Sequence, residues 1–128
     1  MTAQLPSPPP RWQPISQLPT VVVLVDYLRE LVAEHYAMLN LIRQQPYTLD
    51  AATVERAVAL YKEPRQQALM GRYAEQARRW EARARTPEQR RAVEQLIGSL
   101  ERLRAEIAAV LTLADDMQGE RYQAADVR

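Results

Sequence analysis

The chain has 128 residues, with 9 prolines, 3 glycines, no cysteine and a formal net charge of +1. This is the length of a single domain. Alanine, leucine, arginine, glutamate and glutamine dominate, a composition typical of long helices and of an all-α fold. The lack of cysteine excludes a disulfide scaffold and a cysteine-ligated zinc site, and the small net charge predicts no strong overall field for nucleic acid.

The most apolar run covers residues 21–25 and ends at Asp26. It is far shorter than the roughly 20 apolar residues that a membrane-spanning helix needs. The first residues carry neither the early positive charge nor the apolar stretch of a signal peptide. We therefore expect no membrane contacts, and we take a cytoplasmic location as the default.

Residues 1–19 form a proline-rich segment in which helix and sheet are both unfavourable. Its prolines are Pro6, Pro8, Pro9, Pro10, Pro14 and Pro19. We expect an extended, polyproline-like backbone there. Because Trp12 and Ile15 are apolar and a simple linker has no use for a tryptophan, we expect the segment to dock. The surface that receives it is either this chain's own bundle or a partner.

Residues 20–118 carry the patterns of three helices. The first has apolar residues in alternating steps of three and four until Pro46, which predicts an amphipathic helix. These residues are Val21, Leu24, Leu28, Leu31, His35, Met38 and Ile42, with Val25, Val32 and Leu39 beside them. The second helix begins at its N-cap Asp50 and runs to about residue 84. Pro64 lies inside it, and we expect a kink or a short break there.

The third helix has the clearest start signal in the chain. Thr86 is its expected N-cap, Pro87 takes the first helical position, and Gln89 can complete a capping box. Apolar residues then repeat as a heptad pattern. They are Val93, Leu96, Leu100, Leu103, Ile107, Val110, Ala114 and Met117. We expect Gly119 to end this helix, which leaves residues 119–128 as a polar tail.

The two connections, residues 46–49 and 85–86, are short, so consecutive helices must be antiparallel. The sequence therefore predicts an up-down-up three-helix bundle with long, coiled-coil-like helices. Its proline-rich extension precedes the bundle.

Sites for catalysis or metal binding have little support in the sequence. His35, the only histidine, occupies the apolar stripe, so we interpret it as a core residue rather than a metal ligand. There is no glycine-rich phosphate loop and no nucleophile motif, and no carboxylates pair convincingly. The sequence thus predicts no enzymatic activity, no metal or other cofactor, and no small-molecule substrate.

Arginines are concentrated on the second helix and beyond it. Arg65 and Arg72 would lie opposite Glu30 and Asp26 of the first helix, so we expect two ion pairs between the helices. The hairpin tip over residues 78–92 has a net excess of basic side chains that such pairing does not explain. These arginines are Arg78, Arg79, Arg83, Arg85, Arg90 and Arg91. They are candidates for contact with an acidic partner or with a nucleic-acid backbone.

An apolar excess marks the third helix as a candidate interface. Residues 107–114 carry no charge, and a helix that is apolar on all sides is normally covered on all sides. The outer face adds small residues, Gly98, Ala105, Ala108, Ala109 and Thr112. The N-terminal segment, a second copy of the chain or another protein could cover this face.

Together these patterns indicate a non-enzymatic helical interaction protein, a small accessory or adaptor subunit. We expect it to associate with itself or with a protein partner through the outer face of the third helix, through Trp12 and Ile15, or through both. The alternative is a small helical subunit that binds nucleic-acid backbone through the arginine-rich tip inside a larger assembly.

Overall fold

A computed structural model describes residues 12–44 and 51–126, and within these ranges the chain is all-helical, as predicted. Its elements are the short 3₁₀ helix η1 (Ile15–Gln17), α1 (Leu18–Gln44), α2 (Ala51–Lys62), α3 (Pro64–Arg83) and α4 (Pro87–Asp126). The expectations for residues 1–11, for the connection at residues 46–49 and for Asp50 as an N-cap lie outside the described residues.

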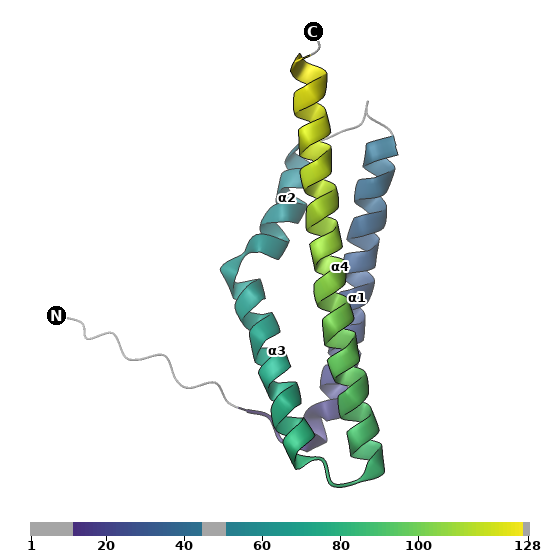
Figure 1. The fold of residues 1–128 in the computed structure, drawn as a ribbon, viewed down its shortest axis with the longest axis vertical. Coiled ribbons are helices and arrows are strands. Elements are labelled where there is room, and N and C mark those ends of the chain that lie inside the picture. Colours follow the sequence, from purple (N-terminus) through teal and green to yellow (C-terminus); the bar gives the residue numbers. More distant parts are fainter. Residues whose placement is uncertain (1–11, 45–50, 127–128) are drawn as a thin grey trace, which may run out of the picture.

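The helix α4 is the centre of the molecule, because α1, α2 and α3 all pack against it. The chain ascends through α1, descends through α2 and α3, and ascends again through α4 (Figure 1). Two ion pairs, Arg29–Glu106 and Arg43–Glu120, join α1 to α4 at the same sequence separation of 77 residues. A constant separation means that α1 and α4 run in the same direction.

The core of α1 is a row of residues spaced by seven, Leu18, Val25, Val32 and Leu39, all buried against α4. The sequence pattern instead centred the core-facing stripe of this helix on the neighbouring row of apolar residues. In the structure Leu24 and Met38 from that row are 40% and 38% exposed. The helix begins at Leu18, which is buried, and Pro19 is tolerated in its first turn.

The descending half of the chain is divided at Glu63 into α2 and α3. Glu63 has an extended backbone, the conformation that proline favours in the residue before it, and Pro64 begins α3. The Glu63 carbonyl accepts hydrogen bonds from the amides of Gln66 and Gln67, which starts the new helix. The sequence predicted a kink or a short break here, and the structure has a break, with Glu63 alone between the two helices.

The predicted capping box at the start of α4 is confirmed. The Gln89 amide donates to Thr86 Oγ1 at 3.1 Å, and the Thr86 amide donates to Gln89 Oε1 at 3.3 Å. The amide of Arg85 also donates to Gln89 Oε1, at 2.9 Å. Two side chains thus satisfy three amides at the turn between α3 and α4.

Replacing Thr86 by alanine should lower the free energy of unfolding by about 1 kcal/mol, because the Gln89 amide loses its acceptor. Thr86→Ser keeps a hydroxyl at the same place and should cost far less. Urea unfolding followed by circular dichroism measures both changes. Equal stability of the alanine and serine variants would show that the capping hydroxyl does not matter.

The end of α4 differs from the prediction. Gly119 does not terminate the helix, which continues to Asp126, and no described glycine has a positive φ. A terminating glycine needs the left-handed conformation, and nothing in the fold imposes it here. Residues 120–126 are mostly good helix formers, and the ion pair of Glu120 with Arg43 ties this last part of α4 to α1.

Candidate functional site

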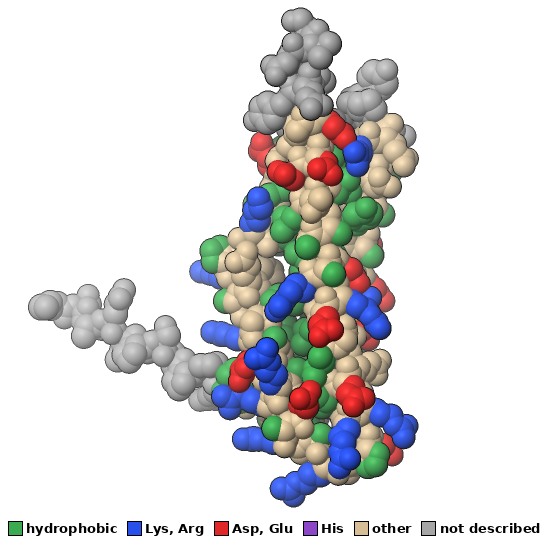
Figure 2. Space-filling model, viewed as in Figure 1, with side chains coloured by type: hydrophobic (Ala, Val, Ile, Leu, Met, Phe, Trp, Pro, Cys, Tyr) green, Lys and Arg blue, Asp and Glu red, His purple; other side chains and the backbone are tan. Residues whose placement is uncertain are grey.

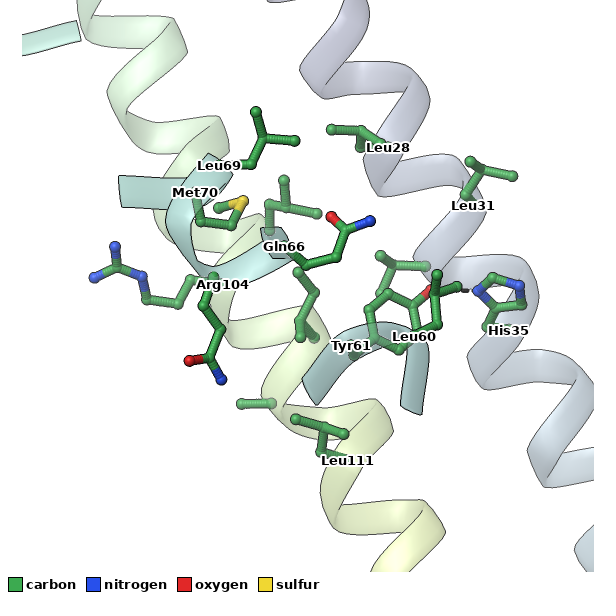
Figure 3. Close-up of a pocket in the computed structure, with 15 residues that line it drawn as sticks. Leu28, Leu31, His35, Leu60, Tyr61, Gln66, Leu69, Met70, Arg104 and Leu111 are labelled. Carbon is green, nitrogen blue, oxygen red and sulfur yellow. Dashed lines mark hydrogen bonds between the residues drawn. The ribbon is translucent and has the colours of Figure 1, made fainter. Parts of the chain in front are cut away.

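A pocket of about 410 Å³ lies where α2 gives way to α3, between these helices, α1 and α4. We call it the central pocket. Leu28 and Leu31 of α1 lie on one side of it, and Leu69 and Met70 of α3 lie on the other (Figure 3). Leu60, Leu103, Ile107 and Leu111 complete most of its apolar lining. Its volume lies within the range found for ligand pockets, and its lining is mostly apolar.

The central pocket exists because α1 and the α2–α3 pair each pack closely on α4 but not on each other. Their main polar link is at one end of the pocket. There the Tyr61 hydroxyl is hydrogen-bonded to Nδ1 of His35, with the rings edge to face and their centroids 5.5 Å apart. Burial raises the pKa of Tyr61 above its usual value, so the hydroxyl keeps its proton in this contact.

His35 is half-buried and contacts Tyr61, in line with its interpretation as a packing residue. Among residues 12–44 and 51–126, no group of histidine and carboxylate side chains is arranged to hold a metal ion. The Arg104 guanidinium points away from the other labelled side chains of the pocket (Figure 3). The other polar side chains that line the pocket are those of His35, Tyr61, Gln66 and Gln67.

The N-terminal residues that the structure describes dock on this chain's own α3. The Gln13 carbonyl accepts hydrogen bonds from Trp80 Nε1 at 3.0 Å and from Gln76 Nε2 at 3.3 Å, and the Gln13 amide donates to Gln76 Oε1 at 2.6 Å. The guanidinium carbon of Arg79 lies 4.2 Å from the centre of the Trp12 ring. Ile15 packs against the buried core. Trp12 and Ile15 thus lie at the end of the bundle remote from the central pocket.

The arginine-rich tip divides into paired and unpaired side chains. Arg78 and Arg79 both lie near Glu75, and Arg90 donates to the Arg85 carbonyl at 3.3 Å. The guanidiniums of Arg83, Arg85 and Arg91 have no partner within the described ranges. All six arginines are exposed. Basic side chains follow α3 and gather at the end where it connects to α4 (Figure 2).

The small residues predicted to form an interface lie where the pattern put them, on the outside of α4. Ala105, Ala109 and Thr112 are exposed, Gly98 is half-buried, and Ala108 is exposed at the edge of the central pocket. The segment 107–114 is not covered on all sides. Val110, Leu113 and Ala114 are buried, while the outer positions face solvent.

Within the described chain, a Cβ added at Gly98 would touch nothing within 4 Å. Gly98→Ala should therefore stabilise the free chain by up to about 1 kcal/mol, because alanine is the better helix former. Thermal unfolding measures this, with Gly71→Ala as the control at another open helical site. Destabilisation by Gly98→Ala alone would show a close contact at that position.

The ion pairs expected between the first two helical segments do not form. Glu30, Asp26, Arg65 and Arg72 are all exposed, and no salt bridge joins them in the described structure. The partner of α1 in ion pairs is α4, through Arg29 and Arg43. The prediction was wrong because it placed α1 directly against α3, whereas both helices pack on α4.

Several exposed or half-buried apolar residues of α1 form a second stripe, which the sequence pattern did not separate from the core. This outer stripe consists of Leu24, Tyr27, Leu31, Met38 and Leu41, exposed or half-buried and spaced by three, four or seven residues. Leu31 also lines the central pocket, so the stripe and the pocket form one continuous surface. Its signal was present in the sequence, because α1 has more apolar positions than one neighbouring helix can cover.

No family model matches this chain, and comparison with curated proteins and with solved structures gives no match either. None of the helices within residues 12–44 and 51–126 is both long and apolar enough to cross a membrane.

Proposed function

We propose that this chain is a non-enzymatic helical interaction protein, a small accessory or adaptor subunit, that binds a helix of another polypeptide. In this view α2 and α3 together act as the middle member of an up-down-up bundle of three. The observation that carries the proposal is the central pocket, which is open and apolar and continues into the outer stripe of α1. A contiguous exposed apolar surface of this kind is typical of interaction sites.

A helix suits this surface better than a small ligand does. The outer stripe has the spacing of three and four residues with which helices pack on one another. The pocket walls come from α1 and α3, which both rest on α4, so an added helix would contact two helices at once. The predicted small-residue face of α4 borders this surface at Ala108 and offers the incoming helix further room for close approach.

A photo-crosslinking amino acid at Leu69, at the pocket wall, tests the proposal in the cells that make the protein. We expect a crosslink from Leu69 to a polypeptide. The matched control is Glu55, which is exposed on α2 and lies outside the pocket lining. A second probe at Ala105 examines the outer face of α4. If neither Leu69 nor Ala105 gives a protein adduct above the Glu55 control, the interaction function is wrong.

A second candidate function is binding of nucleic-acid backbone by the arginine-rich tip. It is favoured by Arg83, Arg85 and Arg91 at the turn from α3 to α4, whose side chains are exposed and have no partner among the described residues. Guanidinium groups on an exposed turn can contact phosphates and release counterions from them.

Fluorescence anisotropy with oligonucleotides tests this second candidate. Binding should fall steeply with salt concentration, and joint replacement of Arg83, Arg85, Arg90 and Arg91 by glutamine should remove most of it. Replacing Arg56 and Arg102, exposed arginines away from the tip, by glutamine is the control. An absence of binding at low salt would eliminate this function for the isolated chain.

A further inference from the structure

Opposite charges flank the two walls of the central pocket. On α1, Glu30 and Glu34 lie beside Leu31. On α3, Arg65 and Arg72 lie on either side of the stretch that lines the pocket. All four side chains are exposed, and within residues 12–44 and 51–126 none of them is in an ion pair. One wall thus offers two carboxylates and the other offers two guanidiniums.

These two charged rows form no ion pair with each other within the described residues, because α1 and α3 pack mainly on α4 rather than on each other. A two-fold symmetric pair of chains removes this obstacle. In such a pair the same surface is used twice, so the acidic row of each copy meets the basic row of the other. The apolar surface between the rows is then buried from both sides.

We propose that the occupant of this surface is a second copy of the same chain, with the outer stripe of each α1 laid over the central pocket of the other copy. The inference rests on the proposed interaction function and names its partner. Charge complementarity favours a second copy over a foreign helix, because this chain carries both halves of the match at the same height along the bundle. Leu31 of α1 and Leu69 of α3, which lie near the two charged rows, both line the central pocket and so lie at the same level along the bundle.

Charge reversal tests the pairing without disturbing the core, because all the changed side chains are exposed. One variant carries Glu30→Arg and Glu34→Arg, and the other carries Arg65→Glu and Arg72→Glu. Sedimentation velocity at low salt should show a concentration-dependent dimer for the native chain. Each variant alone should dissociate at least about tenfold more readily, because like charges now face each other. An equal mixture of the two should form a heterodimer.

The apolar part of the interface has its own matched pair of variants. Met38→Asp places a carboxylate in the outer stripe and should weaken the dimer about tenfold or more. Ala33→Asp places the same group on an exposed part of α1 outside the stripe and should leave the dimer intact. Circular dichroism should show native helix content for both variants.

Several outcomes would overturn the second-copy inference. One is a native chain that stays monomeric at all concentrations, and another is a dimer that survives both charge-reversal variants. Crosslinks from Leu69 to a different protein, with the chain itself monomeric, would refute the second copy while the interaction function stands. Crosslinks from Leu69 to residues 1–11 of the same chain would refute both. A dimer disrupted singly and restored by mixing would establish the inference.

Discussion

Replacing Trp80 by alanine should lower the free energy of unfolding by about 3–5 kcal/mol, a large part of what a domain of this size has. The side chain is 1% exposed and is the largest fully buried one among the described residues. Its loss leaves a cavity where α3 packs on α4. It also removes the Nε1 donor to the Gln13 carbonyl, so the N-terminal residues lose part of their attachment. Urea unfolding followed by circular dichroism measures the change.

Two milder variants separate these contributions. Trp80→Phe keeps most of the ring but loses the Nε1 hydrogen bond, and it should cost less than the alanine variant. Trp12→Ala removes a half-buried ring that stacks on exposed Arg79, and it should cost least. If Trp12→Ala destabilised the chain as much as Trp80→Ala, the N-terminal segment and not the α3 core would be the main support of this end.

The helical fold could be predicted from the sequence because its signals are local. The capping box needs only Thr86 and Gln89, three residues apart, and its geometry depends on the backbone between them. The effect of Pro64 is equally local, since a proline forces the preceding residue out of the helical conformation. The buried row of α4 follows from its heptad spacing and is observed at Leu96, Leu103 and Val110.

The parts that could not be predicted depend on which helices are neighbours. The expected Arg72–Asp26 pair required α1 to lie against α3, and the periodicity of α1 contains no information about that. The central pocket could not be predicted for the same reason, because a pocket between four helices can be recognised only when the distances between the helices are known. The predicted end of α4 at Gly119 was wrong because a glycine permits a helix to end but does not require it.

The rotation of α1 about its axis is the clearest case in which structure and sequence pattern differ, and it predicts a large effect. Val25→Asp should destabilise the fold by about 4 kcal/mol or more, because it places an unpaired charge at a position with 0% exposure. Leu24→Asp, one residue earlier, should change the stability of the dilute chain by less than about 1 kcal/mol, since Leu24 is 40% exposed.

Thermal unfolding of dilute protein distinguishes the two orientations of α1. If the row containing Leu24 faced the core, as the spacing alone suggested, the effects of the two substitutions would be reversed. Three rows of apolar residues run along α1, and α4 covers one of them while Tyr61 and its neighbours cover part of the second. The third is the outer stripe. The small effect of Leu24→Asp on the fold would therefore fit a surface that is apolar for the sake of binding rather than folding.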